Sequence, residues 1–110
     1  MRLRHRDYAQ GVTDSTGRVV LQFTVPPVGY ANSIRRINIA GGAIGGQVTF
    51  YLWSESPENL VEVGRPIDSN VAQEVVDIDV PQSAPLIAIT DHAGDTRQIT
   101  VSIDGWRVAA

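Results

Sequence analysis

Apolar and polar residues alternate with a period of two in segment after segment of this chain, and this alternation constrains its fold more than any other feature. Successive side chains of a β-strand point to opposite faces, so the alternation predicts strands with one buried face. It occurs in segments 18–25, 33–40, 48–53, 76–80 and 99–104, while segment 86–90 is apolar on both faces, as in a central strand. Turn-forming residues separate these segments, and no window long enough for a stable helix has a helical period.

The predicted fold class is all-β: a single antiparallel β-sandwich or small jelly roll of seven to eight strands. A chain of 110 residues suffices for one domain with one two-layer core. We expect this sandwich to occupy residues 16–110. An extended basic N-terminal arm and lead-in is expected over residues 1–15.

Two kinds of irregularity are predicted within the sandwich. Ile34 is out of phase with the isoleucines that follow it, which predicts a β-bulge near Arg35 and Arg36. The glycine-rich run 41–46 and the segment 91–95 both contain turn-forming residues, so we predict hairpin connections there.

Charge is distributed unevenly along the chain. The formal net charge is −3 and all nine basic residues are arginine, three of which, Arg2, Arg4 and Arg6, fall within the first six residues. The rest of the chain is therefore acidic, and Asp77 and Asp79 give one predicted strand an acidic, solvated face. Nucleic-acid binding needs clustered positive charge, and a membrane span needs a long apolar stretch. We expect neither nucleic acid nor membrane as a partner.

The sequence contains no recognisable catalytic machinery. The absence of cysteine excludes disulfides and thiolate-bound zinc. His5 lies in the predicted arm with no scaffold to orient it, and His92, between Asp91 and Asp95, is better explained by a turn than by a metal site or a general base. No serine lies in a nucleophile-elbow pattern, and the glycine run lacks the lysine of a phosphate-binding loop. We therefore expect no enzyme, no cofactor and no metal.

Candidate binding residues fall into two groups. In the predicted arm, Arg2, Leu3, Arg4 and Arg6 are expected to bind protein, with the arginines pairing with carboxylates. The second group consists of aromatic residues outside the core phase of their strands: Tyr30, Tyr51, Trp53 and Trp106. Such residues suit a protein interface or stacking on sugar rings, and they equally suit the filling of a strand's second face.

Four segments, 16–25, 34–39, 48–60 and 99–108, together span most of the chain from Thr16 onward, and the last contains a Gly-Trp-Arg step. In the order of these segments and in their residue pattern, the chain resembles small β-sandwich structural proteins of tailed bacteriophages, especially those of actinobacterial hosts. The resemblance implies a head decoration or minor capsid protein, or else a tail or fibre component. It carries over no functional residue.

The function expected first is that of a non-enzymatic capsid decoration (cement) protein. It would be made in the host bacterial cytoplasm and would lie on the outer capsid surface of the virion, where it binds across joints between major capsid protein subunits and stabilises the shell. Copies of itself are the second expected partner, as a homo-oligomer with the trimer as first expectation. The alternative is a carbohydrate- or receptor-binding module whose aromatic residues stack on sugar rings, or a tail or fibre component.

Overall fold

A computed structural model describes residues 2–52, 59–61, 64–67, 74–81 and 85–109, and in these ranges the chain is all-β. The strands are β1 (Arg2–Val12), β2 (Val20–Gln22), β3 (Tyr30–Gly41), β4 (Gln47–Leu52), β5 (Asn59–Leu60), β6 (Arg65–Pro66), β7 (Glu74–Val80), β8 (Leu86–Asp91) and β9 (Gln98–Ala109). The short β5 and β6 both pair with β4. They therefore occupy the same position in their sheet, beside β4. The predicted all-β class is confirmed.

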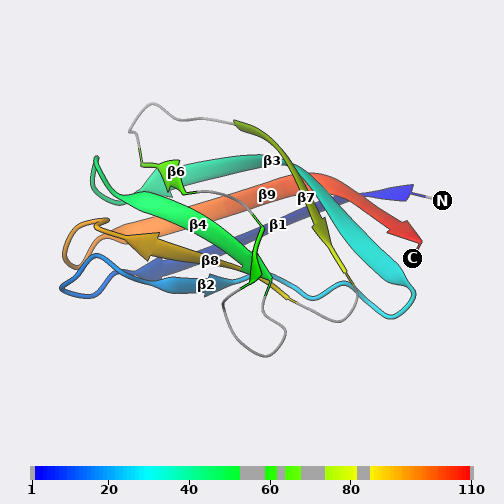
Figure 1. Cartoon of the computed structure of the whole chain (residues 1–110), viewed down its shortest axis with the longest axis horizontal. Helices are drawn as coiled ribbons and strands as arrows, with labels where there is room; N and C mark the ends of the chain where they lie inside the picture. The colour runs from blue at the N-terminus through cyan, green and yellow to red at the C-terminus, as the bar shows by residue number, and fades with distance from the viewer. Residues whose placement is uncertain (1, 53–58, 62–63, 68–73, 82–84, 110) are drawn as a thin grey trace.

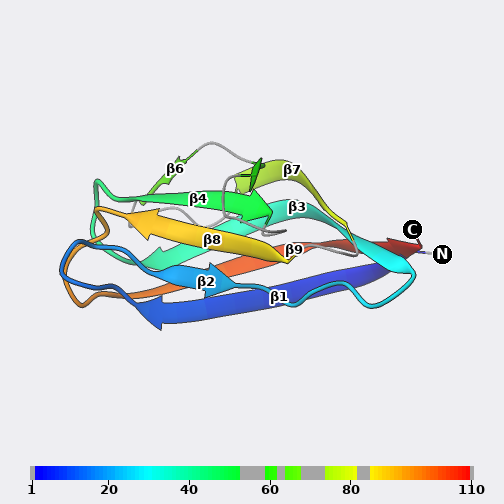
Figure 2. The ribbon, with the colours of Figure 1, turned by 60° about the horizontal axis from the view of Figure 1, so that its bottom comes forward.

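The strands form two antiparallel sheets packed face to face as a sandwich (Figures 1 and 2). One sheet has the order β1-β9-β3-β7, and the other has the order β2-β8-β4-β5, with β6 also on β4. The first strand thus pairs with the last, β2 with β8, β3 with β7, and β4 with β5. This nested pairing, with successive strands passing between the sheets, is the topology of a jelly roll, the second of the two predicted architectures.

The core lies between the sheets and follows the predicted alternation. In β9, Ile99, Val101 and Ile103 are at most 3% exposed, whereas the intervening side chains lie on the outer face. β8 lies between β2 and β4 and is buried over most of its length, as predicted for a central strand. The apolar residues that seal the two inner faces include Phe50 of β4 and Ile34 of β3, both fully buried.

The predicted β-bulge is confirmed. The pairing of β3 shifts register between Ile34 and Arg36, both towards β7 and towards β9. The extra residue, Arg35, allows Ile34 and Ile37 to be buried on the same inner face although they are three positions apart.

The expectation of an arm outside the sandwich is corrected for residues 2–12, which form β1. This strand pairs with β9 along its whole length, from Arg2 opposite Val108 to Val12 opposite Gln98. Its inward positions hold residues such as His5 and Asp7 in place of aliphatic ones, so its alternation is not visible as apolar against polar. The sequence of this strand therefore shows a charged stretch without a strand pattern.

The prediction of hairpin connections at 41–46 and 91–95 is wrong. Both segments pass from one sheet to the other, from β3 to β4 and from β8 to β9. They lie side by side at the end of the sandwich opposite the two chain ends (Figures 1 and 2), where the Ala43 N–H donates to the Ala93 carbonyl at 2.8 Å. Gly41 has a φ of 89°, and a Cβ there would overlap the Gln98 carbonyl oxygen, so glycine serves close packing as well as the turn.

Among the described residues there is no helix of the length and hydropathy needed to cross a bilayer.

Candidate protein-binding surface

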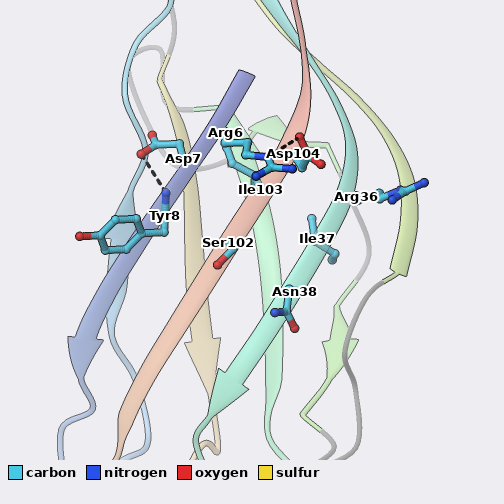
Figure 3. A pocket seen from close by; sticks show the side chains of 9 residues that line it. All are labelled: Arg6, Asp7, Tyr8, Arg36, Ile37, Asn38, Ser102, Ile103 and Asp104. Atoms are coloured by element: carbon cyan, nitrogen blue, oxygen red, sulfur yellow. Dashed lines mark hydrogen bonds and ion pairs between the residues drawn. The ribbon is translucent and has the colours of Figure 1, made fainter. Parts of the chain in front are cut away.

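The outer face of the four-stranded sheet brings charged side chains from three strands together (Figure 3). The strand register places Arg6 of β1 and Arg36 of β3 on either side of Asp104 of β9. Arg4 of β1 lies opposite Trp106, the next outward position along β9. Because β9 is sandwiched between β1 and β3, residues from the two ends and the middle of the sequence become neighbours.

One carboxylate orients two of these arginines. Asp104 Oδ2 accepts a hydrogen bond from Arg4 Nη2 at 3.0 Å, and Asp104 Oδ1 lies 3.6 Å from Arg6 Nε. The arginine side chains are 56% and 68% exposed, so these ion pairs contribute only about 0–1 kcal/mol to stability. Their main effect is to hold both guanidinium groups over the sheet, with most of their five donors still available to a partner.

A hollow of about 420 Å³ opens on the same face. It is bordered by Arg6, Tyr8, Arg36, Asn38 and Ser102 among others, and Figure 3 shows their side chains around it. Guanidinium, phenol, amide and hydroxyl groups are the groups that bind carboxylates and peptide groups of another protein. This surface is therefore a candidate for binding another protein.

The residues predicted for the arm are distributed over β1. Arg4 and Arg6 lie on the outer face, as just described. Leu3 lies opposite Arg107 and is 47% exposed. Arg2 begins the strand, opposite Val108.

Sequence reasoning missed most residues of the surface, among them Tyr8, Arg36 and Asp104. Tyr8 is 64% exposed and in phase with Arg4 and Arg6, so extending the period-two pattern through residue 8 would have found it. Arg36 and Asp104 join the surface only because their strands flank each other in the sheet.

The predicted aromatic residues are not brought to one place. Trp106 is half-buried on the arginine-bearing sheet, and Tyr30 is at the start of β3, opposite Ala109. Tyr51 belongs to β4, in the other sheet. Trp53 lies outside the described residues.

His5 is not an unoriented arm residue, because it lies on the inner face of β1 and is only 7% exposed. Arg107 Nη2 lies 3.2 Å from His5 Nδ1, and Arg107 Nε donates to Asn32 Oδ1 at 3.0 Å. Since a guanidinium only donates, Nδ1 is the acceptor and the proton of the neutral ring sits on Nε2. Nε2 is buried without a hydrogen-bond partner among the described residues.

Burial lowers the pKa of His5 below its usual 6.5, and the charge of Arg107 lowers it further, against a smaller opposite effect of Asp7 and Asp104. The unfolded chain therefore takes up a proton at His5 at a higher pH than the native protein does. The free energy of unfolding should fall as the pH decreases through about 6.5 and stop falling from this cause below the native pKa.

The expected measurement is urea unfolding at several pH values between about 5 and 8. The variant His5→Asn, whose amide oxygen can accept from Arg107, should lose this pH dependence. His92→Asn is the matched control and should keep it, because the His92 side chain is 82% exposed. Equal pH profiles for wild type and H5N would contradict the assignment.

His92 lies at a loop tip. Its Nδ1 is 3.2 Å from Asp91 Oδ1, and its φ of 53° is a left-handed turn conformation. No group of three or more histidine, aspartate or glutamate side chains within the described ranges is arranged to hold a metal ion.

Comparison with known proteins gives a match at the level of structure. No protein-family model matches the chain, and no curated protein matches its sequence. The whole chain superposes on the whole of a chain from the acidic stable capsid structure of Helicobacter pylori bacteriophage KHP30, with a TM-score of 0.57 and 13% sequence identity. At this identity the likeness establishes a shared fold.

Proposed function

We propose that this chain is a non-enzymatic structural protein of a bacteriophage virion, and that it serves as a capsid decoration protein. The observation that carries the proposal is the fold likeness to a chain of a phage capsid structure over 100% of both chains. Because the likeness covers both chains completely, no part of this chain remains outside it that would suggest another role.

The arginine-bearing face supports a binding role. Arg6 and Arg36 flank a hollow on a sheet that is held rigid by long antiparallel pairings. In this role, they bind carboxylates of the major capsid protein on the outer surface of the shell. Each copy would bridge neighbouring capsid subunits, and the repetition of weak contacts over the shell would give high avidity without one tight interface.

The test is binding to phage heads purified without this protein. Full-length protein should co-sediment with the heads to saturation at a fixed number of copies per capsid subunit, and it should raise the temperature at which the heads rupture. Binding should weaken at high salt, since its contacts are charged. Absence of co-sedimentation at low salt would refute decoration, and a tail component or a sugar-binding module would then be tested next.

A charge reversal at the centre of the surface tests which face docks. Arg36→Glu should weaken binding to heads about tenfold or more, because it replaces an attraction by a repulsion; tenfold corresponds to about 1.4 kcal/mol. Arg97→Glu makes the same change of charge at an exposed residue next to segment 91–95, at the end of the sandwich opposite the two chain ends (the loop end). This variant should bind as the wild type does. Equal loss in both variants would show only a dependence on net charge and would contradict docking through the four-stranded sheet.

A further inference from the structure

The two edge strands of the four-stranded sheet differ in charge. β1 is at one edge and carries Arg2, Arg4 and Arg6 among its first residues. β7 is at the other edge, and its seven residues include Asp77 and Asp79 (Figure 2). One molecule therefore has a basic and an acidic edge on the same sheet.

Arg4 and Arg6 of β1 and Asp79 of β7 lie on the same outer face of the sheet. Arg4 and Arg6 are on the face opposite to the buried His5. On β7, Asp79 is exposed, whereas its neighbours Ile78 and Val80 are at most 2% exposed and face the core. Side chains on an edge strand and on the same face of a sheet are placed to contact a strand added beside them.

The strand directions also match. Three antiparallel pairings separate β1 from β7, so the two strands run in opposite directions. A second copy that continues the sheet would place its β7 beside β1 in antiparallel orientation, with the outer face of both copies on the same side.

Backbone groups are available for this pairing at the start of β1. The Thr13 N–H donates to the Arg97 carbonyl, and the register of β1 and β9 continues from this pair. Every second residue of β1, counted back from Thr13, therefore directs its backbone groups towards β9. Arg4 and Arg6 consequently present their backbone N–H and C=O groups to the free edge. Tyr8 is the next residue whose backbone faces this edge, and its N–H already donates to the Asp7 carboxylate at 2.8 Å. The stretch of β1 that can pair with an added strand therefore ends at residue 7.

We infer that β1 of one copy pairs with β7 of a second copy, with Arg4 opposite Asp79 and Arg6 opposite Asp77. The contact is head-to-tail, so it closes into a ring where the rotation between copies permits. The arginine-bearing hollows of all copies then lie on the same surface of the joined sheets. This self-association goes beyond the proposed decoration function and does not require a capsid.

The experiment is sedimentation equilibrium of the full-length protein at low and high salt. Wild type should exceed the monomer mass at low salt and dissociate at high salt. R4E/R6E and D77R/D79R should each weaken association on the order of 10- to 100-fold, since each turns two cross-strand attractions into repulsions. R18E/R97E, with the same change of charge as R4E/R6E at exposed residues of the loop end, should associate as wild type does. Circular dichroism and melting confirm that each variant is folded.

Mixing decides the geometry. R4E/R6E has two acidic edges and D77R/D79R has two basic edges, so each variant should associate only weakly with itself. An equimolar mixture of the two should associate, in even-numbered assemblies. A wild type that stays monomeric at low salt, or a mixture that stays monomeric, would overturn the inference. The inference would also be overturned if R4E/R6E lost association while D77R/D79R kept it, because that result indicates a symmetric β1–β1 contact. Binding of a monomeric wild type to phage heads would leave the decoration function standing while this inference fails.

Discussion

Replacing Phe50 with alanine is expected to lower the free energy of unfolding by about 3–5 kcal/mol. The side chain is fully buried on β4, between β8 and the short β5 and β6. Its ring centroid lies 6.4 Å from that of Phe23, with 24° between the ring planes. The substitution removes this contact and leaves a cavity that two hydrogen-bonded sheets cannot close. A domain of this size has only about 5–15 kcal/mol of total stability, so F50A should unfold at a much lower urea concentration.

Two controls make this result interpretable. Val20→Ala, at a residue that is 51% exposed, should change the free energy of unfolding by no more than about 0.5 kcal/mol. Phe50→Leu should lose clearly less than F50A, because it refills most of the volume. Equal losses in F50A and V20A would show that the two sheets are not packed around this ring.

Replacing Gly105 with alanine is expected to cost about 2–3 kcal/mol, although the change adds only one methyl group. A Cβ at this position would overlap the Ser33 carbonyl oxygen and lie 3.0 Å from Ile34 Cα. Both are backbone atoms of β3 at the bulge. They can move only if β3 and β9 separate where their register shifts. The measurement is urea unfolding, together with the native fluorescence of the adjacent Trp106 in variants that also carry Trp53→Phe, the second tryptophan of the chain.

Gly29→Ala is the matched control. Gly29 has a φ of 86°, but a Cβ there meets no atom within 4 Å, so the expected loss is the backbone strain alone, about 1 kcal/mol. The fluorescence of Trp106 should change in G105A and remain as in the wild type in G29A. A loss in G105A no greater than in G29A would contradict the close approach of β3 and β9.

Much of the local structure could be predicted from the sequence, because local structure depends on the order of side chains along one strand. The alternation of Ile99, Val101 and Ile103 with polar residues determined that this segment is a strand with one buried face. The bulge was predictable for the same reason: Ile34 and Ile37 can share a face only if one residue between them is extra.

The candidate surface could be predicted only in part. Arg4 and Arg6 were predicted to bind protein as parts of a free arm, because His5 and Asp7 at the inward positions hid the alternation of β1. The structure places both arginines on the exposed face of that strand, and their binding role stays a prediction. Asp104, which orients both arginines, is 100 positions from Arg4 in the sequence. No local pattern identifies such a partner, since the pairing depends on which strands are neighbours in the sheet.

The sequence by itself thus determined the all-β class, the faces of the strands and the bulge. Tertiary structure decided which sheet each strand joins, and so turned segments 41–46 and 91–95 from expected hairpins into crossings between the sheets. The physical reason is that burial of one face is satisfied equally well by several strand orders. Long-range pairing of β1 with β9 and of β3 with β9 selects one order, and with it the assembly of the arginine-bearing surface.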